Sequence, residues 1–177
     1  DELAAQVPIL KDVLDAMNIR RLEYEGYEAD DIIGSISLCA ENEGMDVVIL
    51  TGDRDSLQLV SNKTRVKLPT TRKGKNETIE YDYESIVNEY GIVPEQFIDL
   101  KGLMGDPSDN IPGVKGIGEK TALALIKEYG SVEGVYENLE NIKGKSIREK
   151  LAENREMALL SKKLAAINRQ MPWMCSI

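Results

Sequence analysis

The sequence predicts an α/β fold in which a parallel-sheet core is followed by a smaller helical subdomain. Helical and strand patterns alternate in the first third of the chain, and this order favours right-handed crossovers between neighbouring parallel strands. The apolar run of residues 47–50 alternates poorly, which is typical of a strand buried on both faces. No strand pattern is evident after about residue 110. We therefore expect two parts, residues 1–104 and residues 105–177, with a boundary near residue 105.

The first part is predicted to open with a helix and a strand, followed by a second helix and strand. Residues 2–17 place apolar side chains at helical spacing around Pro8. Residues 19–24 have the pattern of a short strand, and residues 27–44 that of a helix opened by acids and stopped by a glycine. The apolar strand within residues 46–53 then ends in a loop.

The remaining elements follow from turn chemistry and helical spacing. Residues 64–69 and 77–81 flank the polar segment TTRKGKN, which predicts a β-hairpin. Short helices are expected where apolar side chains recur at helical spacing between glycines and prolines. They cover residues 83–91, 93–105, 118–129, 131–139 and 146–168.

Charge and composition narrow the functional classes. The chain has 177 residues with a net charge of -9 and no histidine. Its first third is strongly acidic and its C-terminal tail is basic, so a nucleic-acid-binding patch on an acidic body is compatible with the sequence. No apolar run approaches the roughly 20 residues that span a bilayer, and no signal peptide opens the chain. We expect no membrane partner and a cytoplasmic location.

Seven acids fall in three clusters at expected element ends or loops. The clusters are Glu28, Asp30 and Asp31; Asp53 and Asp55; and Asp106 and Asp109. Ligands of open α/β sheets bind outside the carboxyl ends of parallel strands, where the second cluster is expected. Each cluster taken singly also suits helix caps and turns. Taken together, so many carboxylates at one place would repel unless cations lay between them.

The ligand set favours hard cations. Oxygen ligands alone indicate Mg²⁺ or Mn²⁺. The absence of histidine removes a histidine base, a Ser-His-Asp triad and most zinc sites. If the chain is an enzyme, metal-activated water is the natural nucleophile.

The segment GVKGIGEKTA combines three glycines and two lysines ahead of an expected helix. Free backbone amides at a helix start bind phosphate, and Lys115 and Lys120 add positive charge beside them. The spacing matches neither the dinucleotide fingerprint nor the P-loop. A tight turn between two packed helices is the alternative interpretation.

Three motifs together carry a family resemblance. GYEADDIIGS, TGDRDSLQLV and GDPSDNIPGVKGIGEKTA occur in the order found in the 5′→3′ exonuclease domain of bacterial DNA polymerase I, a member of the 5′-nuclease (flap endonuclease) superfamily. The resemblance covers essentially residues 1–170. It implies a PIN-like, Rossmann-like sheet core followed by a helix-hairpin-helix (H3TH) subdomain. It also implies a metal-dependent nuclease that cleaves 5′ flaps and 5′ ends of DNA in replication and repair.

The resemblance also implies roles for individual residues. Two Mg²⁺ or Mn²⁺ ions would be held, the first by Glu28 and Asp30 with Asp31 beside them, the second by Asp53, Asp55, Asp109 and Asp106. The hairpin would grip duplex DNA without reading its sequence. Its DNA-binding residues would be Gly113, Lys115, Gly116, Gly118, Lys120 and Thr121, with K⁺ on the carbonyls of Val114 and Ile117.

The chain departs from the family pattern at its start. The family's first strand, which carries a further metal-binding Asp, and the helical arch with its basic residues have no counterpart here. We therefore expect a piece of a longer bacterial, nucleoid-associated protein, continuous with a polymerase domain, and weak or absent nuclease activity for these residues alone. A non-catalytic duplex-DNA-binding module and a metal-dependent phosphatase are the alternatives.

Two basic stretches complete the candidates. Residues 63–75 hold six basic side chains and no acid, and are either a solvated surface loop or a further DNA contact. Residues 143–150 lie downstream of the glycine turn and either extend the phosphate track or form an ordinary solvated helix face.

Overall fold

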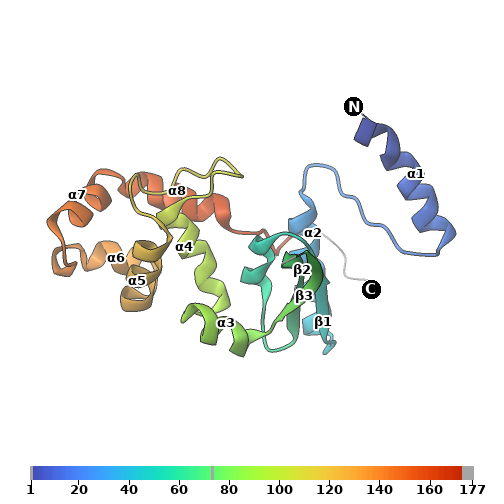
Figure 1. The fold of residues 1–177 in the computed structure, drawn as a ribbon, viewed down its shortest axis with the longest axis horizontal. Helices are drawn as coiled ribbons and strands as arrows, with labels where there is room; N and C mark the ends of the chain where they lie inside the picture. Colours follow the sequence, from blue (N-terminus) through green and yellow to red (C-terminus); the bar gives the residue numbers. More distant parts are fainter. Residues whose placement is uncertain (1, 73, 173–177) are drawn as a thin grey trace.

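The computed structural model describes residues 2–72 and 74–172. It is elongated, with a small sheet at its centre, helices to one side and an N-terminal helix standing apart (Figure 1). The sheet half contains α1 (Glu2–Ala16), α2 (Ala29–Asn42), β1 (Val47–Leu50), η1 (Arg54–Leu59), β2 (Thr64–Arg72), β3 (Lys75–Tyr81) and α3 (Tyr83–Tyr90). The helical half contains η2 (Pro94–Gln96), α4 (Phe97–Met104), α5 (Glu119–Tyr129), α6 (Val132–Glu137), η3 (Leu139–Asn141), α7 (Lys145–Glu153) and α8 (Arg155–Ala165).

The sheet is mixed, with strand order β1-β2-β3. β1 runs parallel to β2, with Val47 opposite Thr64. β2 and β3 form the predicted hairpin, with Val66 opposite Tyr81. The α/β class is confirmed. The parallel part of the sheet consists of a single strand pair among the described residues.

Two strand predictions are wrong. The segment 19–24 forms no strand in the described structure. It runs through the loop between α1 and α2, away from the sheet, so no strand pairs with it (Figure 1). β1 is also not buried on both faces, because Val48 is 48% exposed and Leu50 is 68% exposed. β1 is the edge strand of the sheet. In the part of the chain that the structure describes, no element covers the face of β1 on which Val48 and Leu50 lie.

Helix ends follow the expected stop signals. α2 ends just before Gly44, which has φ 87°. α3 begins at a capping box in which Asp82 accepts from the Ser85 amide, and ends at the left-handed Gly91. The single helix expected over residues 146–168 is two helices, α7 and α8. It breaks at Asn154, whose φ of -122° is not helical and whose side-chain amide donates to the Lys150 carbonyl at 2.8 Å.

One hydrophobic core runs through both halves. Its fully buried members include Leu57 and Val66 on the sheet side and Leu103, Ile126 and Leu151 on the helical side. α4 packs along α8 and also contacts η1, which in turn packs against β2. The boundary near residue 105 stays a prediction, since the core is continuous across it.

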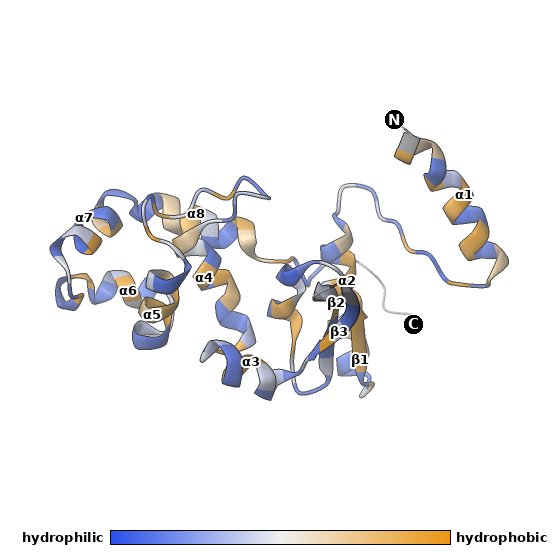
Figure 2. Ribbon diagram, in the orientation of Figure 1, coloured by the Kyte–Doolittle hydropathy of each residue, from blue (hydrophilic) through white to orange (hydrophobic). Residues whose placement is uncertain are grey.

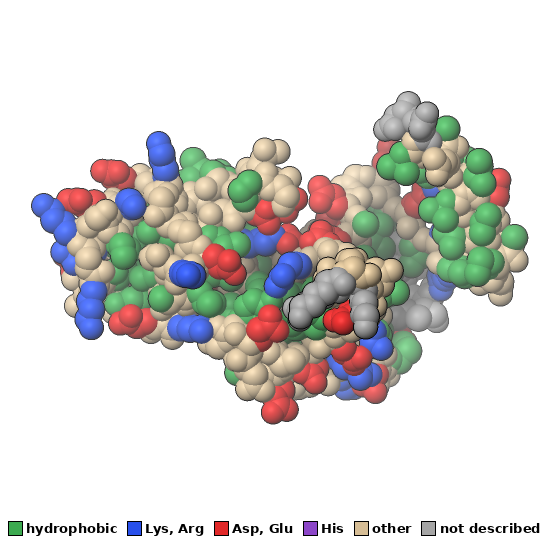
Figure 3. Space-filling model, viewed as in Figure 1, with side chains coloured by type: hydrophobic (Ala, Val, Ile, Leu, Met, Phe, Trp, Pro, Cys, Tyr) green, Lys and Arg blue, Asp and Glu red, His purple; other side chains and the backbone are tan. Residues whose placement is uncertain are grey.

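The helix α1 lies apart from this core. It contains Pro8, and its apolar side chains are largely exposed, with Leu3 at 69% and Ile9 at 63% (Figures 2 and 3). Among the described helices, none combines the length and the apolar character needed to cross a bilayer.

A buried ion pair fixes α4 against α6 and α8. Asp99 is 5% exposed, accepts a hydrogen bond from the Val132 amide at 2.8 Å and pairs with Lys162 at 2.7 Å. Asp99→Ala leaves the Val132 amide without its acceptor and removes the buried partner of Lys162, so we expect the free energy of unfolding to fall by about 2 to 3 kcal/mol, measured by denaturant unfolding. Glu133→Gln removes the half-exposed second partner of Lys162 and should cost less than about 1 kcal/mol. Equal losses in the two variants would contradict this account.

Candidate metal centre and the adjoining glycine hairpin

Most of the predicted metal ligands line one cleft. Its volume is about 640 Å³. Its acidic lining is Glu28, Asp30, Asp31, Asp53, Asp55 and Asp109. The opposite wall is residues 163–168, the end of α8 and the segment after it. Acidic side chains gather beside the hollow between the sheet half and the helical half (Figure 3). Six acids from three separate segments of the sequence thus meet in one place, as predicted.

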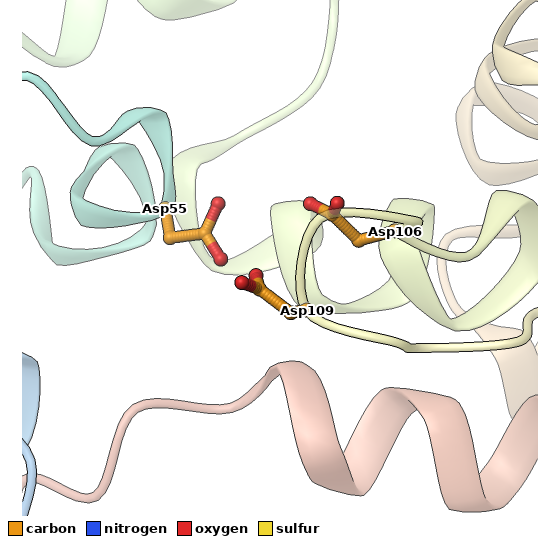
Figure 4. A group of neighbouring side chains, drawn as sticks. All are labelled: Asp55, Asp106 and Asp109. Carbon is orange, nitrogen blue, oxygen red and sulfur yellow. The ribbon is translucent and has the colours of Figure 1, made fainter.

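Three carboxylates form a tighter group within this region. One oxygen each from Asp55, Asp106 and Asp109 lies within 4.8 Å of the other two. Asp55 comes from η1, and the other two come from the loop after α4, with all three side chains converging (Figure 4). Such spacing suits a single divalent cation with oxygen ligands.

The same acids also fix their local backbone. Asp53 is the N-cap of η1 and accepts a hydrogen bond from the Asp55 amide at 2.9 Å. Asp106 accepts from the Ser108 amide at 2.9 Å. Its backbone pairs with Ile111 through two hydrogen bonds of 2.8 Å. The cap and turn interpretations are therefore correct for Asp53 and Asp106, and these interactions aim the carboxyl groups into the site.

The first acid cluster lies at the start of α2. Glu28 is the N-cap residue without a side-chain cap bond, and Asp30 and Asp31 are in the first turn, where the helix dipole favours negative charge. Asp31 accepts a hydrogen bond from the Asn168 amide at 2.8 Å. This bond joins α2 to the segment after α8. Asp31 therefore also holds in place the wall of the cleft that residues 163–168 form.

Burial and crowding disfavour charge on two of the acids. Burial, reinforced by the charges of Asp53 and Asp55, raises the pKa of Asp30. Burial raises the pKa of Asp55 too, against the opposing effect of Lys101. For Asp106, burial is outweighed by hydrogen bonds from Lys101 and Ser108, which hold its pKa at about 2. The raised pKa values of Asp30 and Asp55 mean that these two acids resist ionisation in the absence of a metal ion, which fits metal binding.

Lys101 is the site residue that the sequence reasoning missed. It is 8% exposed, and its ammonium pairs with Asp55, with Asp106 at 2.6 Å, and with Asp109 at 3.9 Å. Burial lowers the pKa of Lys101, but the hydrogen bonds that its ammonium donates to Asp106 and Asp55 prevail and raise it. The available signal was a lone lysine in the apolar helix FIDLKGLM, where a solvated face would carry more polar residues.

The raised pKa of Asp30 predicts a gain in stability when its charge is removed. A raised carboxyl pKa lowers folding stability at pH values above it, and the cost fades as the pH falls through that pKa. In EDTA at pH 7, Asp30→Asn should raise the Tm. The gain should shrink in acid, and added Mn²⁺ should stabilise the variant less than the unchanged protein. Glu84→Gln, on the exposed start of α3, is the control, and a lowered Tm for Asp30→Asn in EDTA would count against the account.

The glycine hairpin begins at the end of the acidic loop. Gly113 is buried, has φ 61°, and donates its amide to the Ser161 hydroxyl at 2.9 Å. Gly113, predicted as a DNA contact, therefore lies inside the protein and fixes the conformation of the loop. Gly116 and Gly118 are exposed, and Gly118 is the N-cap of α5. The first hydrogen bonds of α5 come from Thr121 and Ala122 to the Gly118 carbonyl, so the earlier amides are the ones open to an anion.

The predicted basic and carbonyl groups surround this helix start. Lys115 and Lys120 are exposed and Thr121 is half-buried. The side chains of Val114 and Ile117 are buried in the core, and the Val114 carbonyl accepts the Ile117 amide at 3.0 Å. The Lys150 ammonium donates to the Gly116 carbonyl at 3.2 Å. The hairpin thus has a rigid apolar underside and a polar, basic outer surface.

The other basic stretches are partly engaged elsewhere. Arg65 and Lys67 both pair with Glu80 across the hairpin, at 2.9 and 3.2 Å. This pairing favours a solvated surface for the stretch 63–75, where residue 73 lies outside the described part of the chain. In the second stretch, Arg148 donates to the Ile142 carbonyl at 2.6 Å, and Lys145 pairs with Glu149 at 3.6 Å.

Comparison with protein families divides the chain into two matched segments. Residues 1–91 match the model of the 5′-3′ exonuclease N-terminal resolvase-like domain. Residues 92–177 match that of the 5′-3′ exonuclease C-terminal SAM fold. Together the two matches cover the chain from end to end.

Curated relatives are DNA polymerases. DNA polymerase I of Bacillus caldotenax is 52% identical over 97% of this chain and 19% of its own length. DNA polymerase I of Bacillus subtilis (strain 168) is 48% identical over the same shares. The chain therefore spans about a fifth of the length of the relatives it matches.

Solved structures with the same fold include nucleases of bacteriophage T5. T5 5′-exonuclease with bound zinc superposes with a TM-score of 0.76 at 29% identity, over 90% of this chain and 58% of that one. The T5 flap endonuclease in a product complex with DNA and metal ions gives 0.72 at 28%, over 90% and 57%. The catalytic core of Rad2 with DNA substrate gives 0.60 at 21%, over 93% and 58%, which shows the fold alone.

Proposed function

The chain belongs to the 5′-3′ exonuclease family, and from this premise we propose that it forms the 5′-nuclease domain of a DNA polymerase I. In this proposal it cleaves DNA phosphodiesters at 5′ flaps and 5′ ends during replication and repair, with two Mg²⁺ or Mn²⁺ ions. The observation that carries the proposal is the cleft in which acids from three distant segments converge. The loop that supplies Asp106 and Asp109 continues directly into the glycine hairpin.

The residues present fit divalent metal ions. Asp30 and Asp55 are half-buried and have raised pKa values, as expected of acids that lack their cation. Glu28 and Asp30 would hold one ion. Asp53, Asp55, Asp106 and Asp109 would hold the other. When bound, the ions activate water and neutralise charge that develops on the scissile phosphate.

The residues of this chain form the walls of the cleft and hold them in place. The segment 163–168 faces the acids across the cleft, and the Asp31 bond to Asn168 keeps that wall in place. Histidine is absent from these 177 residues, so within this chain the groups in the cleft that can accept a proton are its carboxylates. Basic residues that act on the phosphate would come from outside this chain.

The hairpin would hold the duplex through phosphates. The helix start at Gly118 offers backbone amides, and exposed Lys115 and Lys120 add charge on either side. These contacts position DNA without reading its sequence. The carbonyls of Val114 and Ile117 would take K⁺ at the same place. We further propose that a polymerase domain continues the native chain, in the cytoplasm of a bacterium and on its nucleoid.

A non-catalytic duplex-binding module is the second candidate. The observation that favours it is Lys101, which already neutralises part of the acid group without a metal. Duplex binding that is independent of Mg²⁺, without cleavage, would support this candidate.

The test uses the full-length native protein and a labelled 5′-flap substrate. We expect cleavage near the flap junction in Mg²⁺ and none in EDTA. These 177 residues alone should cleave weakly or not at all. Duplex binding with no cleavage in Mg²⁺ or Mn²⁺ by the full-length protein would overturn the nuclease assignment and leave the binding module.

A further inference from the structure

The ammonium of Lys101 occupies the place that a cation would take among the second group of acids. It pairs with Asp55 and lies 2.6 Å from Asp106 and 3.9 Å from Asp109. These are the same three carboxylates whose oxygens lie within 4.8 Å of one another. The side chain reaches them from inside the protein, since Lys101 on α4 is only 8% exposed.

A lysine and a divalent ion cannot share these oxygens. Like charges a few ångströms apart repel strongly where water is scarce, and an ammonium paired with Asp55 and Asp106 blocks the lone pairs that a metal needs. Without any cation, three carboxylates this close would repel one another in turn. The charge of Lys101 therefore stabilises the metal-free arrangement and opposes the entry of metal.

The structure offers the ammonium a second position. Beside it lies a cavity of about 280 Å³ whose lining includes Tyr90, Met104 and Glu119, and also Arg54, whose guanidinium donates a hydrogen bond to the Tyr90 hydroxyl. A lysine stem is long and flexible, so its head can turn while the helix stays in place. Glu119, the first residue of α5, supplies an alternative carboxylate on that side.

We propose that Lys101 is a built-in counter-ion: it substitutes for the second metal ion in the metal-free protein and moves aside when that ion binds. This rests on the proposed metal-binding function. Lys101 would keep Asp55, Asp106 and Asp109 assembled before the metal arrives. It would also weaken the affinity of the site, so that the ion is held less tightly than the acids alone would hold it.

The test is calorimetric titration of the full-length native protein with Mn²⁺. Removing one positive charge from the site should tighten binding there by about tenfold or more in Lys101→Met, while the Tm in EDTA falls. The matched control is Lys162→Met, which removes a lysine paired with Asp99 and Glu133, acids outside the site. The control should lower the Tm and leave Mn²⁺ affinity unchanged. Titration of Asp55→Asn identifies the heat that belongs to this site.

The outcomes separate the two proposals. Unchanged or weaker Mn²⁺ affinity in folded Lys101→Met, with the Asp55-dependent heat present, overturns the counter-ion proposal alone. Absence of any Asp55-dependent heat in the unchanged protein overturns the metal site itself. If Lys101→Met does not fold, the rate at which Lys101 is acylated in the unchanged protein, followed by mass spectrometry, provides the test. Labelling that speeds up severalfold with Mg²⁺ supports release of the ammonium, and equal or slower labelling overturns it.

Discussion

Asp55→Asn is expected to lower flap cleavage by the full-length native protein at least about a hundredfold, because it removes a direct ligand of the proposed second metal ion. Asp55 belongs to the group of three carboxylates and, like Asp109, also borders the cleft with the other acids. Its side chain is only 17% exposed, so solvent cannot readily replace it as a ligand. Asn keeps the shape of the side chain and one of its oxygens. The loss should therefore appear in kcat and in Mn²⁺ affinity, with the fold retained.

We expect Asp55→Asn to remain folded because Lys101 keeps its ion pair with Asp106 at 2.6 Å. No charge is then left buried alone. Glu84→Gln changes an exposed acid on α3 and should leave cleavage within about twofold, as is usual for exposed sites remote from the chemistry. Cleavage by Asp55→Asn at a comparable rate would remove Asp55 from the catalytic machinery.

Gly113→Ala is expected to destabilise the protein by about 3 kcal/mol or more and to abolish duplex binding. A Cβ at this position would lie 2.2 Å from the Gly105 nitrogen and 2.6 Å from the Met104 carbonyl carbon. Both are backbone atoms, so no side chain can move away to make room. The left-handed φ of 61° adds strain for alanine. Because the loop 105–113 carries Asp106 and Asp109, the change should disturb the acid group as well.

Gly118→Ala is the matched control in the same hairpin. Nothing lies within 4 Å of a Cβ there, and its φ of -96° suits alanine. Stability should change by less than about 1 kcal/mol. Denaturant unfolding and fluorescence anisotropy with a labelled duplex measure both variants. Equal behaviour of the two alanines would contradict the structural role assigned to Gly113.

Local signals predicted most elements of the fold. Periodic apolar spacing and glycine stops located α2, α3 and α5. The signals that start and stop these helices lie within or next to the helices in the sequence. The failures depend on what lies nearby in space. Residues 19–24 have strand-forming side chains but no partner strand, and the pattern of β1 does not reveal that it is an edge. The break at Asn154 depends on a single non-helical residue within an otherwise helical pattern.

The sequence predicted those parts of the site whose residues lie close together along the chain. Acids at the start of α2, at η1 and after α4 mark three element ends, and topology brings element ends together. Lys101 and the wall at 163–168 carry no motif, since their role arises from packing between α4, α8 and α2. The buried position of Gly113 likewise depends on its contact with Gly105, which the glycine spacing alone does not show.

Anomalous diffraction from crystals of the native protein soaked in Mn²⁺ would show whether the converging acids bind divalent metal. We expect one manganese peak among Asp55, Asp106 and Asp109, and a second beside Glu28 and Asp30. The Lys101 ammonium should have turned away from the first peak. An anomalous map with manganese only outside the cleft, and Lys101 still between the acids, would contradict this expectation.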